Sequence, residues 1–334
     1  MTIRERLEEN EKEILSPYAT LSVNTRGRLR EEEHCDIRPV FQRDRDRILH
    51  CKSFRRLKDK TQVFLTPDGD HYRTRMTHTL EVSQNARTIA KALHLNEDLV
   101  EAISLGHDLG HTPFGHAGER ALNSICPLGF KHNEQSLRTV DILEKDGLGL
   151  NLTFEVRDGI LHHQTEGSPS TLEGKIVRFS DKIAYIHHDM DDAIRGQILE
   201  EKDIPAEISE VLGSTCGERL DHFIHDIITN SLGKDDIQMS PPVADAMKKL
   251  RHFMFVHVYQ NPAAKGEEGK AEGIVETLYE YYLRHIDKLP EDLLALVDQG
   301  EYRERIVCDY ISAMTDRFAR AQYEELFIPK SWHY

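Results

Sequence analysis

Histidines gather in one short segment of the chain, together with acidic and turn-forming residues. This segment, HDLGHTPFGHAGE, contains His107, His111 and His116 along with Asp108 and Glu119. A single histidine is most often a solvated or structural residue, but a cluster this dense is typical of a site that binds metal or moves protons. We therefore expect chemistry to centre on this segment.

Four side chains from three segments have the types expected of ligands for one divalent cation. His78 lies near the start of an expected helix, His107 and Asp108 end the next one, and Asp181 belongs to a third, RFSDKIAYIHHD. Nitrogen and oxygen donors without thiolates suit Mn, Fe, Co, Ni, Zn or Mg. A site without cysteine and with open coordination positions is more often catalytic than structural.

Two further spacings predict groups that act beside such an ion. Arg75 lies three residues before His78, so on a helix its guanidinium would share the face of that ligand and could bind phosphate oxygens. His116 and Glu119 are also three apart, and the carboxylate could hold the imidazole in one tautomer. For Arg73, simple pairing with a surface carboxylate is an equally good interpretation.

A stripe of side chains continues from the expected metal ligand on the third segment. Asp181, Tyr185 and Asp189 are spaced four residues apart, which places them on one helix face, and Lys182 lies beside them. A tyrosine at such spacing is more often a core residue. A stripe that starts at a metal ligand nevertheless runs into the same cleft, so these residues are candidates for substrate contact.

The elements that must position these residues are almost all helices. Apolar residues at helical spacing predict helices over 78–95, 96–108, 133–145, 152–164, 172–195 and 243–260, with Asn96 as an N-cap. The one strand candidate is TQVFL at 61–65, before the turn TPDGD, which predicts at most a small β-hairpin. Residues 260–273 are expected to form an exposed loop.

Composition and charge limit the classes of function. The chain has 334 residues, 39% of them hydrophobic and 30% charged, with a formal net charge of −15. This charge disfavours binding nucleic acid by bulk electrostatics. Residues 26–60 are nevertheless rich in arginine and lysine, which predicts either a solvated helix face or a phosphate-binding wall, and leaves a nucleic-acid-binding helical module as one alternative.

Neither membrane insertion nor disulfide bonding is expected. No apolar run approaches the length of about 18 to 20 residues that spans a bilayer, and the first residues do not resemble a signal peptide. The five cysteines are scattered and never form a C-x-x-C pair, so they are predicted to be free thiols. We expect a cytoplasmic protein.

The pattern formed by His78, His107, Asp108 and Asp181 resembles the H…HD…D signature of the HD-domain phosphohydrolase superfamily. The stretches FQRDRDRILHCKSFRRLKDKTQVF, DHYRTRMTHTLEVSQNARTIAKAL, AISLGHDLGHTPFGHAGE and DYISAMTDRFA closely resemble bacterial dGTP triphosphohydrolase-like proteins of type 2. This resemblance extends over residues 18–320. It implies hydrolysis of a deoxynucleoside triphosphate to deoxynucleoside and inorganic triphosphate.

The resemblance also implies an architecture and an assembly. The expected fold is an all-α HD-domain helical bundle with additional C-terminal helices. We expect a basic N-terminal segment (1–60) packed on an HD-domain core (61–210), followed by a C-terminal helical region (211–334). Relatives of this kind imply a homo-oligomer, either a tetramer or a hexamer.

The resemblance assigns roles to individual residues. It implies catalytic roles for His116 and Glu119, and a contact between Tyr185 and the deoxyribose. It further implies that Asp189 and Gln62 bind the 3′-hydroxyl and that Arg75 and Lys182 meet phosphate. His111 and His132 match polar histidines of related active sites and could equally be residues that only support the site.

Alternative functions from other classes stay open at this point. Another HD-domain chemistry, such as that of a nucleoside-5′-monophosphatase or a phosphodiesterase, would use the same four metal ligands. A nucleotide sensor without catalysis would bind deoxynucleoside triphosphates only to control assembly. The residues do not indicate which base is preferred.

Overall fold

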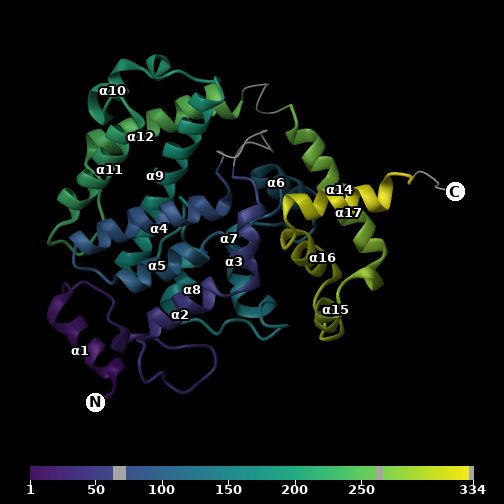
Figure 1. Cartoon of the computed structure of the whole chain (residues 1–334), viewed down its shortest axis with the longest axis horizontal. Coiled ribbons are helices and arrows are strands. Elements are labelled where there is room, and N and C mark those ends of the chain that lie inside the picture. Colours follow the sequence, from purple (N-terminus) through teal and green to yellow (C-terminus); the bar gives the residue numbers. More distant parts are fainter. Residues whose placement is uncertain (63–72, 261–265, 331–334) are drawn as a thin grey trace.

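The computed structural model describes residues 1–62, 73–260 and 266–330, and these residues form an all-helical fold (Figure 1). The α-helices are α1 (Ile3–Ile14), α2 (Val40–Leu49), α3 (Lys52–Arg56), α4 (Arg75–Ala92), α5 (Glu97–Gly106), α6 (Gly115–Ile125), α7 (His132–Arg138), α8 (Phe154–Leu161), α9 (Leu172–Arg195), α10 (Ala206–Leu212), α11 (Cys216–Ser231), α12 (Pro241–Met254), α14 (Glu268–Arg284), α15 (Glu291–Asp298), α16 (Arg303–Ser312) and α17 (Asp316–Phe327). Among these described residues, β-type pairing is limited to two isolated bridges. The predicted all-α class is confirmed.

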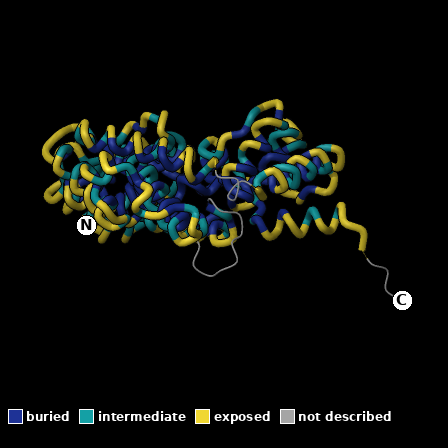
Figure 2. Tube along the Cα trace, turned by 90° about the horizontal axis from the view of Figure 1, so that it is seen from above, coloured by how far each residue is buried: buried dark blue, intermediate teal, exposed yellow. Residues whose placement is uncertain are grey.

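Buried apolar side chains form two separate core clusters, around which the exposed residues lie (Figure 2). The first cluster joins α2 to α5 with α8 to α12. The second joins α6 to α14 and the three C-terminal helices. Figure 1 shows α14 to α17 on the right and α10 to α12 at the upper left. The domain boundaries at 60/61 and 210/211 stay a prediction.

The helices that carry the expected metal ligands begin and end close to the predicted positions. Asn96 caps α5 by accepting a hydrogen bond from the backbone N–H of Leu99, as its side chain predicts. The helix ends at Gly106, so His107 and Asp108 lie just past its C-terminus. Helix α4 begins at Arg75, and therefore Arg75 and His78 lie one turn apart on the same helix.

The sequence predicts a loop over residues 260–273 and a strand over residues 61–65. The expected loop over 260–273 is wrong at its C-terminal end, because Glu268 already begins α14 and both glycines in that part of the sequence are helical. Tertiary packing against α6 and α16 stabilises the helix there despite the low helix propensity of glycine. Of the predicted strand 61–65, residues 63–65 lie outside the described residues, whereas Thr61 forms an antiparallel bridge with Thr74.

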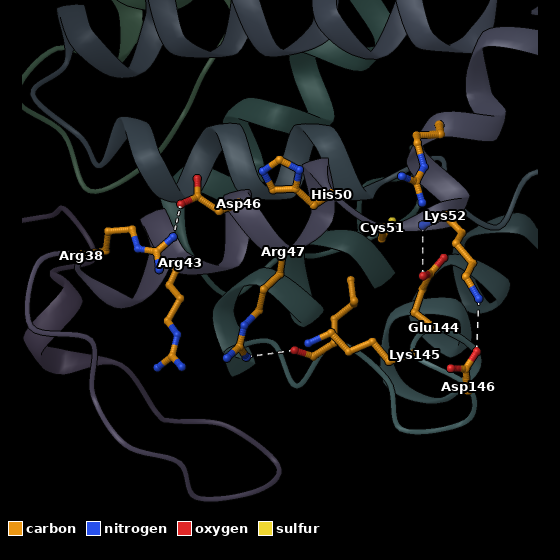
Figure 3. Close-up of a pocket in the computed structure, with 12 residues that line it drawn as sticks. Arg38, Arg43, Asp46, Arg47, His50, Cys51, Lys52, Glu144, Lys145 and Asp146 are labelled. Carbon is orange, nitrogen blue, oxygen red and sulfur yellow. Dashed lines mark hydrogen bonds and ion pairs between the residues drawn. The ribbon is translucent and has the colours of Figure 1, made fainter.

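The basic segment 26–60 contributes no lining residue to the cavity beside the histidines. Its arginines instead line a separate surface hollow of about 590 Å³ (Figure 3). There Arg38 pairs with Asp46, and Arg47 donates to the Leu150 carbonyl. Arg38, Arg43 and Arg47 thus have acceptors within their own surface, which hold this part of the segment to the core.

Free thiols are confirmed for all five cysteines, three of which are buried. In the described part of the chain, no helix combines the length and apolar character needed to cross a membrane.

Candidate metal centre and its cavity

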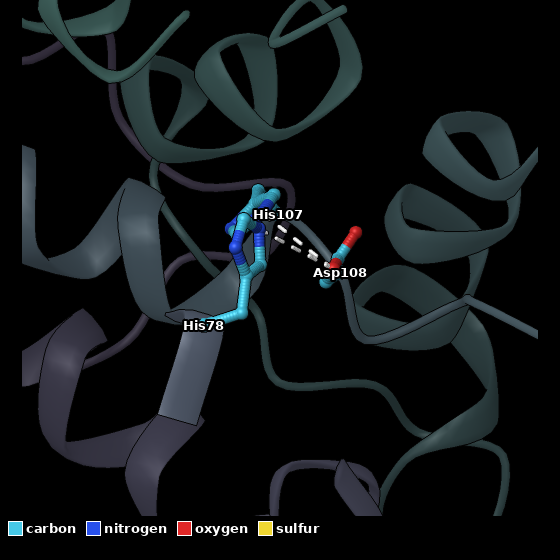
Figure 4. A group of neighbouring side chains, drawn as sticks. All are labelled: His78, His107 and Asp108. Atoms are coloured by element: carbon cyan, nitrogen blue, oxygen red, sulfur yellow. Dashed lines mark ion pairs between the residues drawn. The ribbon is translucent and has the colours of Figure 1, made fainter. Parts of the chain in front are cut away.

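Three of the four predicted metal ligands lie close together and are buried (Figure 4). One potential ligand atom from each of His78, His107 and Asp108 lies within 4.8 Å of the other two. The Nε2 atoms of both histidines point toward the same carboxylate oxygen, Oδ2 of Asp108, at 4.0 and 3.7 Å. The end of α5 and the first turn of α4 thus converge on one point.

Asp181 completes this group from helix α9. Its Oδ1 atom lies 3.2 Å from Nε2 of His78 and 3.8 Å from Nε2 of His107. Two imidazole nitrogens and two carboxylates therefore face a common centre. The sequence predicted these four residues, and the structure brings all four together.

The hydrogen-bond partners of these histidines fit metal binding. Nδ1 of His107 donates to the Ser104 carbonyl at 2.6 Å, which leaves Nε2 with its lone pair directed at the centre. This Nε2 is buried and has no hydrogen-bond partner within residues 1–62, 73–260 and 266–330. Because a buried polar atom without a partner is costly, a cation at this centre would satisfy it.

Nearby positive charge keeps the carboxylates ionised. Burial opposes the charge of Asp108, but Arg75 at 2.6 Å and the neighbouring histidines outweigh it and hold the pKa of Asp108 well below its usual range. For Asp181, burial is similarly outweighed by the hydrogen bond with His78 and the charge of His107, which lowers the pKa to about 2. Both groups are therefore available as anionic ligands at neutral pH.

The loop after the His-Asp doublet is held in place by close backbone contacts. A Cβ atom at Gly110 would lie 2.2 Å from the backbone nitrogen of Ser136, so only glycine allows α7 to approach. Phe114 adopts a left-handed φ of 62° just before α6. Its backbone N–H donates to Asp316 at 2.9 Å, so the start of α17 supports this strained turn.

A row of stacked or edge-on imidazoles runs from the metal centre along the loop. Ring centroids of consecutive members are between 4.7 and 5.6 Å apart, in the order His78, His107, His163, His132, His111 and His116. All but the last are mostly or fully buried, whereas two-thirds of the His116 side chain is exposed. Neighbouring histidine rings thus connect the segment 107–119 to the metal centre.

Glu119 binds a different histidine more closely than predicted. It accepts hydrogen bonds from the backbone N–H of His132 at 2.8 Å and from its Nδ1 at 2.9 Å. Nδ1 of His116 is farther away, at 3.5 Å. The predicted His116–Glu119 pair exists, but His132 is the main partner of the carboxylate, because the turn before α7 brings it against α6.

The contacts of His132 favour a proton on both of its ring nitrogens. If His163 donates from Nδ1 to the Ile160 carbonyl, its Nε2 can only accept, and Nε2 of His132 lies 3.2 Å from it. Burial lowers the pKa of His132, but the hydrogen bond and charge of Glu119 outweigh it and raise that pKa. Burial and neighbouring histidines lower the pKa of His163 to about 4. The surroundings thus favour the charged form of His132 and the neutral form of His163.

These groups line a cavity of about 600 Å³ between the two core clusters. Of the predicted residues, its lining includes Gln62, Arg75, His78, Asp108, His111, His116, His132, Asp181, Tyr185 and Asp189. His107, Glu119 and Lys182 are not part of the lining. The cavity volume suits a ligand of nucleotide size.

The stripe on α9 faces the cavity as its spacing predicts. Tyr185 lines it beneath the guanidinium of Arg251, and Asp189 is buried next to it. Asp189 accepts a hydrogen bond from the Tyr259 hydroxyl through one carboxyl oxygen. Oε1 of Gln62, which also lines the cavity, is buried and has no hydrogen-bond partner among the described residues. Asp189 and Gln62 thus both offer acceptor oxygens to this space.

Comparison with known proteins places this arrangement in a family. Residues 75–186 match the HD domain, and residues 237–325 match a phosphohydrolase-associated domain. A deoxyguanosinetriphosphate triphosphohydrolase-like protein of Caldanaerobacter subterraneus subsp. tengcongensis is 57% identical over 332 residues, covering 99% of this chain and 98% of the relative. The chain belongs to the dGTPase-like family of HD-domain proteins.

Further relatives extend this similarity. The dGTPase-like protein of Desulfatibacillum aliphaticivorans is 47% identical over 348 residues, covering 98% of this chain and 99% of the relative. A solved phosphohydrolase of Bacteroides thetaiotaomicron shares the fold, with a TM-score of 0.54 and 15% identity over 85% of this chain and 69% of that one. This dGTPase-like chain is therefore an HD-domain phosphohydrolase with a buried cluster of metal-type ligands.

Several residues of the dGTPase-like site escaped the sequence analysis. Sequence reasoning missed His163, Arg120, Phe255 and Tyr259, all of which line the cavity. Only His163 had a visible signal, since it belongs to a histidine doublet at the end of an expected helix. Arg73, for which two interpretations stood open, pairs with acidic side chains on α9 at 2.8 and 2.9 Å.

We expect Asp189 to contribute a fall in the stability of the metal-free dGTPase-like protein as pH rises from about 4 to 7. Burial raises the pKa of this carboxyl to about 7, while the unfolded chain has the ordinary value of 3.8. The native state therefore binds more protons in this range, and Asp189 contributes a slope of at most about −1.4 kcal/mol per pH unit. Asp189→Asn should remove this slope in urea unfolding.

The control for this prediction is Asp221→Asn, which changes an aspartate whose side chain is 77% exposed. It should leave the pH dependence of unfolding as in the wild type. Equal slopes for Asp189→Asn and the wild type would contradict the raised pKa.

Proposed function

We propose that this protein is a metal-dependent dNTP triphosphohydrolase. It would hydrolyse a deoxynucleoside triphosphate at the α-phosphate, so that water adds to phosphorus, the bond to the 5′-oxygen breaks, and deoxynucleoside and triphosphate leave. The observation that carries this proposal is one cavity lined by Arg75, His78, Asp108, Asp181 and most of the imidazole row, with His107 close to these ligands outside the lining.

The metal centre and the phosphate side of the site follow from the ligand set. His78, His107, Asp108 and Asp181 would hold a divalent ion, which when bound would neutralise phosphate charge and activate a water for attack. Arg75 lies against Asp108 with its second terminal nitrogen directed toward the Gln62 backbone carbonyl, 3.5 Å away. Its guanidinium would bind phosphate oxygens at the edge of the centre.

The histidines supply the proton that the 5′-oxygen needs when it leaves. His116 is the most exposed member of the row, and Glu119 links it to charged His132. His116 would face the scissile bond, while Glu119 and His132 maintain the local charge and orientation. His111, stacked 4.7 Å from His132, would position this group rather than transfer a proton itself.

The other wall of the cavity would bind the sugar. Tyr185 would lie against the deoxyribose, where a 2′-hydroxyl would clash, and the free acceptors of Asp189 and Gln62 would bind the 3′-hydroxyl. Lys182 follows a metal ligand in sequence, and burial and nearby arginines lower its pKa to about 8. It would have to rotate into the cavity to meet phosphate.

Ribonucleotides should be poor substrates. Tyr185→Ala should lower the ratio of kcat/KM for a dNTP to kcat/KM for the matching NTP about tenfold, which is the effect of removing one steric contact. The measurement is hydrolysis of each dNTP and its matching NTP by wild type and variant. Tyr302→Ala, which changes a tyrosine that is 69% exposed and outside the cavity, is the control. Equal wild-type rates on dNTPs and NTPs would rule out the steric role.

Product analysis tests the proposed reaction. Purified protein is incubated with each dNTP and Mn²⁺ or Mg²⁺, and phosphates and nucleosides are separated by ion-exchange chromatography. Triphosphate with deoxynucleoside supports the proposal. Orthophosphate released from nucleoside monophosphates, or cleavage of phosphodiesters, would favour another HD-domain chemistry, and nucleotide binding without products would favour a sensor.

Assembly and nucleic-acid binding are separate proposals. We propose a homo-oligomer, a tetramer or a hexamer, on the strength of the family, and native mass measurement tests it. The basic hollow in Figure 3 keeps the nucleic-acid alternative testable by salt-dependent DNA binding.

A further inference from the structure

A buried histidine outside the predicted ligand set lies directly behind one of the metal ligands. His188 on α9 is 1% exposed, and its Nδ1 atom lies 3.4 Å from Nδ1 of His78 on α4. The two rings meet edge to face, with centroids 5.5 Å apart and planes at 90°. On the other side of His188, Nε2 contacts the carboxylate of Glu81.

Helix α9 therefore supplies a contact on each side of the His78 ring. Asp181 and His188 lie seven residues apart on α9, which is two helical turns, and they face opposite edges of the His78 ring. Glu81 lies one turn beyond His78 on α4 and reaches back to His188. The second histidine ligand, His107, is held differently, because its Nδ1 donates to a backbone carbonyl.

The direction of each hydrogen bond follows from what metal binding requires. A coordinating Nε2 of His78 carries no proton, so the proton of that ring is on Nδ1 and is donated to His188. Nδ1 of His188 then accepts, which places its own proton on Nε2, the nitrogen that contacts the Glu81 carboxylate. Arg73 lies 3.3 Å from Glu81 and compensates the carboxylate charge.

We propose that His188 and Glu81 form a positioning pair that fixes the tautomer and ring orientation of His78 for metal binding. This inference rests on the metal centre of the proposed function and adds two residues to it. Neither residue touches the predicted ion or the substrate. Outer partners of this kind typically change metal affinity by 10- to 100-fold when they are lost.

Two substitutions of His188 separate positioning from simple packing. The amide of His188→Asn lies where Nδ1 lies and can still accept from His78. The longer side chain of His188→Gln places its amide near the position of Nε2, where it can reach Glu81 but not His78. Both are polar and similar in size, so a purely structural role would not distinguish them in this way. His187→Asn, on the neighbouring half-buried histidine, is the matched control.

The measurement is Mn²⁺ affinity of the nucleotide-free protein, read from the electron paramagnetic resonance signal of free Mn²⁺, with urea unfolding of each variant alongside. We expect His188→Gln to bind Mn²⁺ about 10- to 100-fold more weakly, and His188→Asn and His187→Asn to stay within about threefold of the wild type. Glu81→Gln keeps an acceptor without charge and should weaken binding less than His188→Gln.

The inference would be overturned if His188→Gln bound Mn²⁺ as tightly as the wild type. It would also be overturned if the Asn and Gln variants of His188 lost equal Mn²⁺ affinity, in proportion to their loss of stability. A wild-type protein that binds no Mn²⁺ would overturn the metal centre itself and this inference with it. Wild-type binding with the wrong order of variants would overturn only the positioning pair, so the two failures are distinguishable.

Discussion

Asp108→Ala is expected to lose stoichiometric metal and to lower dNTP hydrolysis by on the order of a thousandfold or more. Oδ2 of Asp108 faces both histidine ligands and Arg75 at once, so its removal takes one anionic donor and leaves the guanidinium without its carboxylate partner. The remaining uncompensated positive charge would repel a cation from the same place. A Lewis-acid contribution of several kcal/mol accounts for the size of the effect.

The measurement is elemental analysis of the purified variant together with its rate of triphosphate release. Asp44→Ala is the matched control, because Asp44 is also a fully buried aspartate paired with an arginine, Arg28, but lies on α2 outside the cavity. It should lower stability and retain metal. A folded Asp108→Ala protein with one tightly bound ion and normal turnover would remove Asp108 from the ligand set.

Glu119→Ala is expected to retain metal and to lose about 10²- to 10⁴-fold in single-turnover hydrolysis, as much as His116→Ala. A carboxylate that only orients His116, as the sequence predicts, would give a smaller effect than His116→Ala. In the structure Glu119 also binds His132 and maintains its charge. Without the carboxylate, burial would lower the pKa of His132 and the imidazolium would lose its proton near neutral pH.

This prediction is checked at saturating dNTP, with metal analysis and calorimetric nucleotide binding. The double variant of Glu119 and His132 should be little slower than Glu119→Ala, because residues that act as a unit are not additive. Glu134→Ala is the control, as Glu134 lies on α7 near His132 but its side chain is 53% exposed. If Glu119→Ala hydrolysed dNTP at the wild-type rate, the carboxylate would have no part in proton transfer.

Local patterns in the sequence were enough to predict the helices α4, α5 and α9, which position the four metal-type side chains. Helical spacing predicted α4, α5 and α9, and Asn96 predicted where α5 begins. The same spacing placed Arg75 one turn before His78, and Tyr185 and Asp189 on the face of Asp181. These inferences succeeded because three- and four-residue separations determine which side chains share a helix face.

The long-range partners were decided by tertiary structure alone. Lys60 illustrates this, since its buried ammonium donates to the carbonyls of His111 and Ser312 and joins the site loop to α16. Arginines of the N-terminal segment likewise pair with acceptors at their own surface hollow and do not line the cavity. The contacts of Lys60 have no signal in local sequence, because they join segments that are 51 and 252 residues apart in the chain.

The sequence by itself determined the helical class, the four metal-type ligands and the residues of one helix that face the cavity. Only the tertiary structure decided that Glu119 binds His132, that His163 connects the two ends of the imidazole row, and that His188 supports His78. The physical reason is that helix periodicity orients a side chain relative to its own axis. Which side chain it meets depends on how separate helices pack.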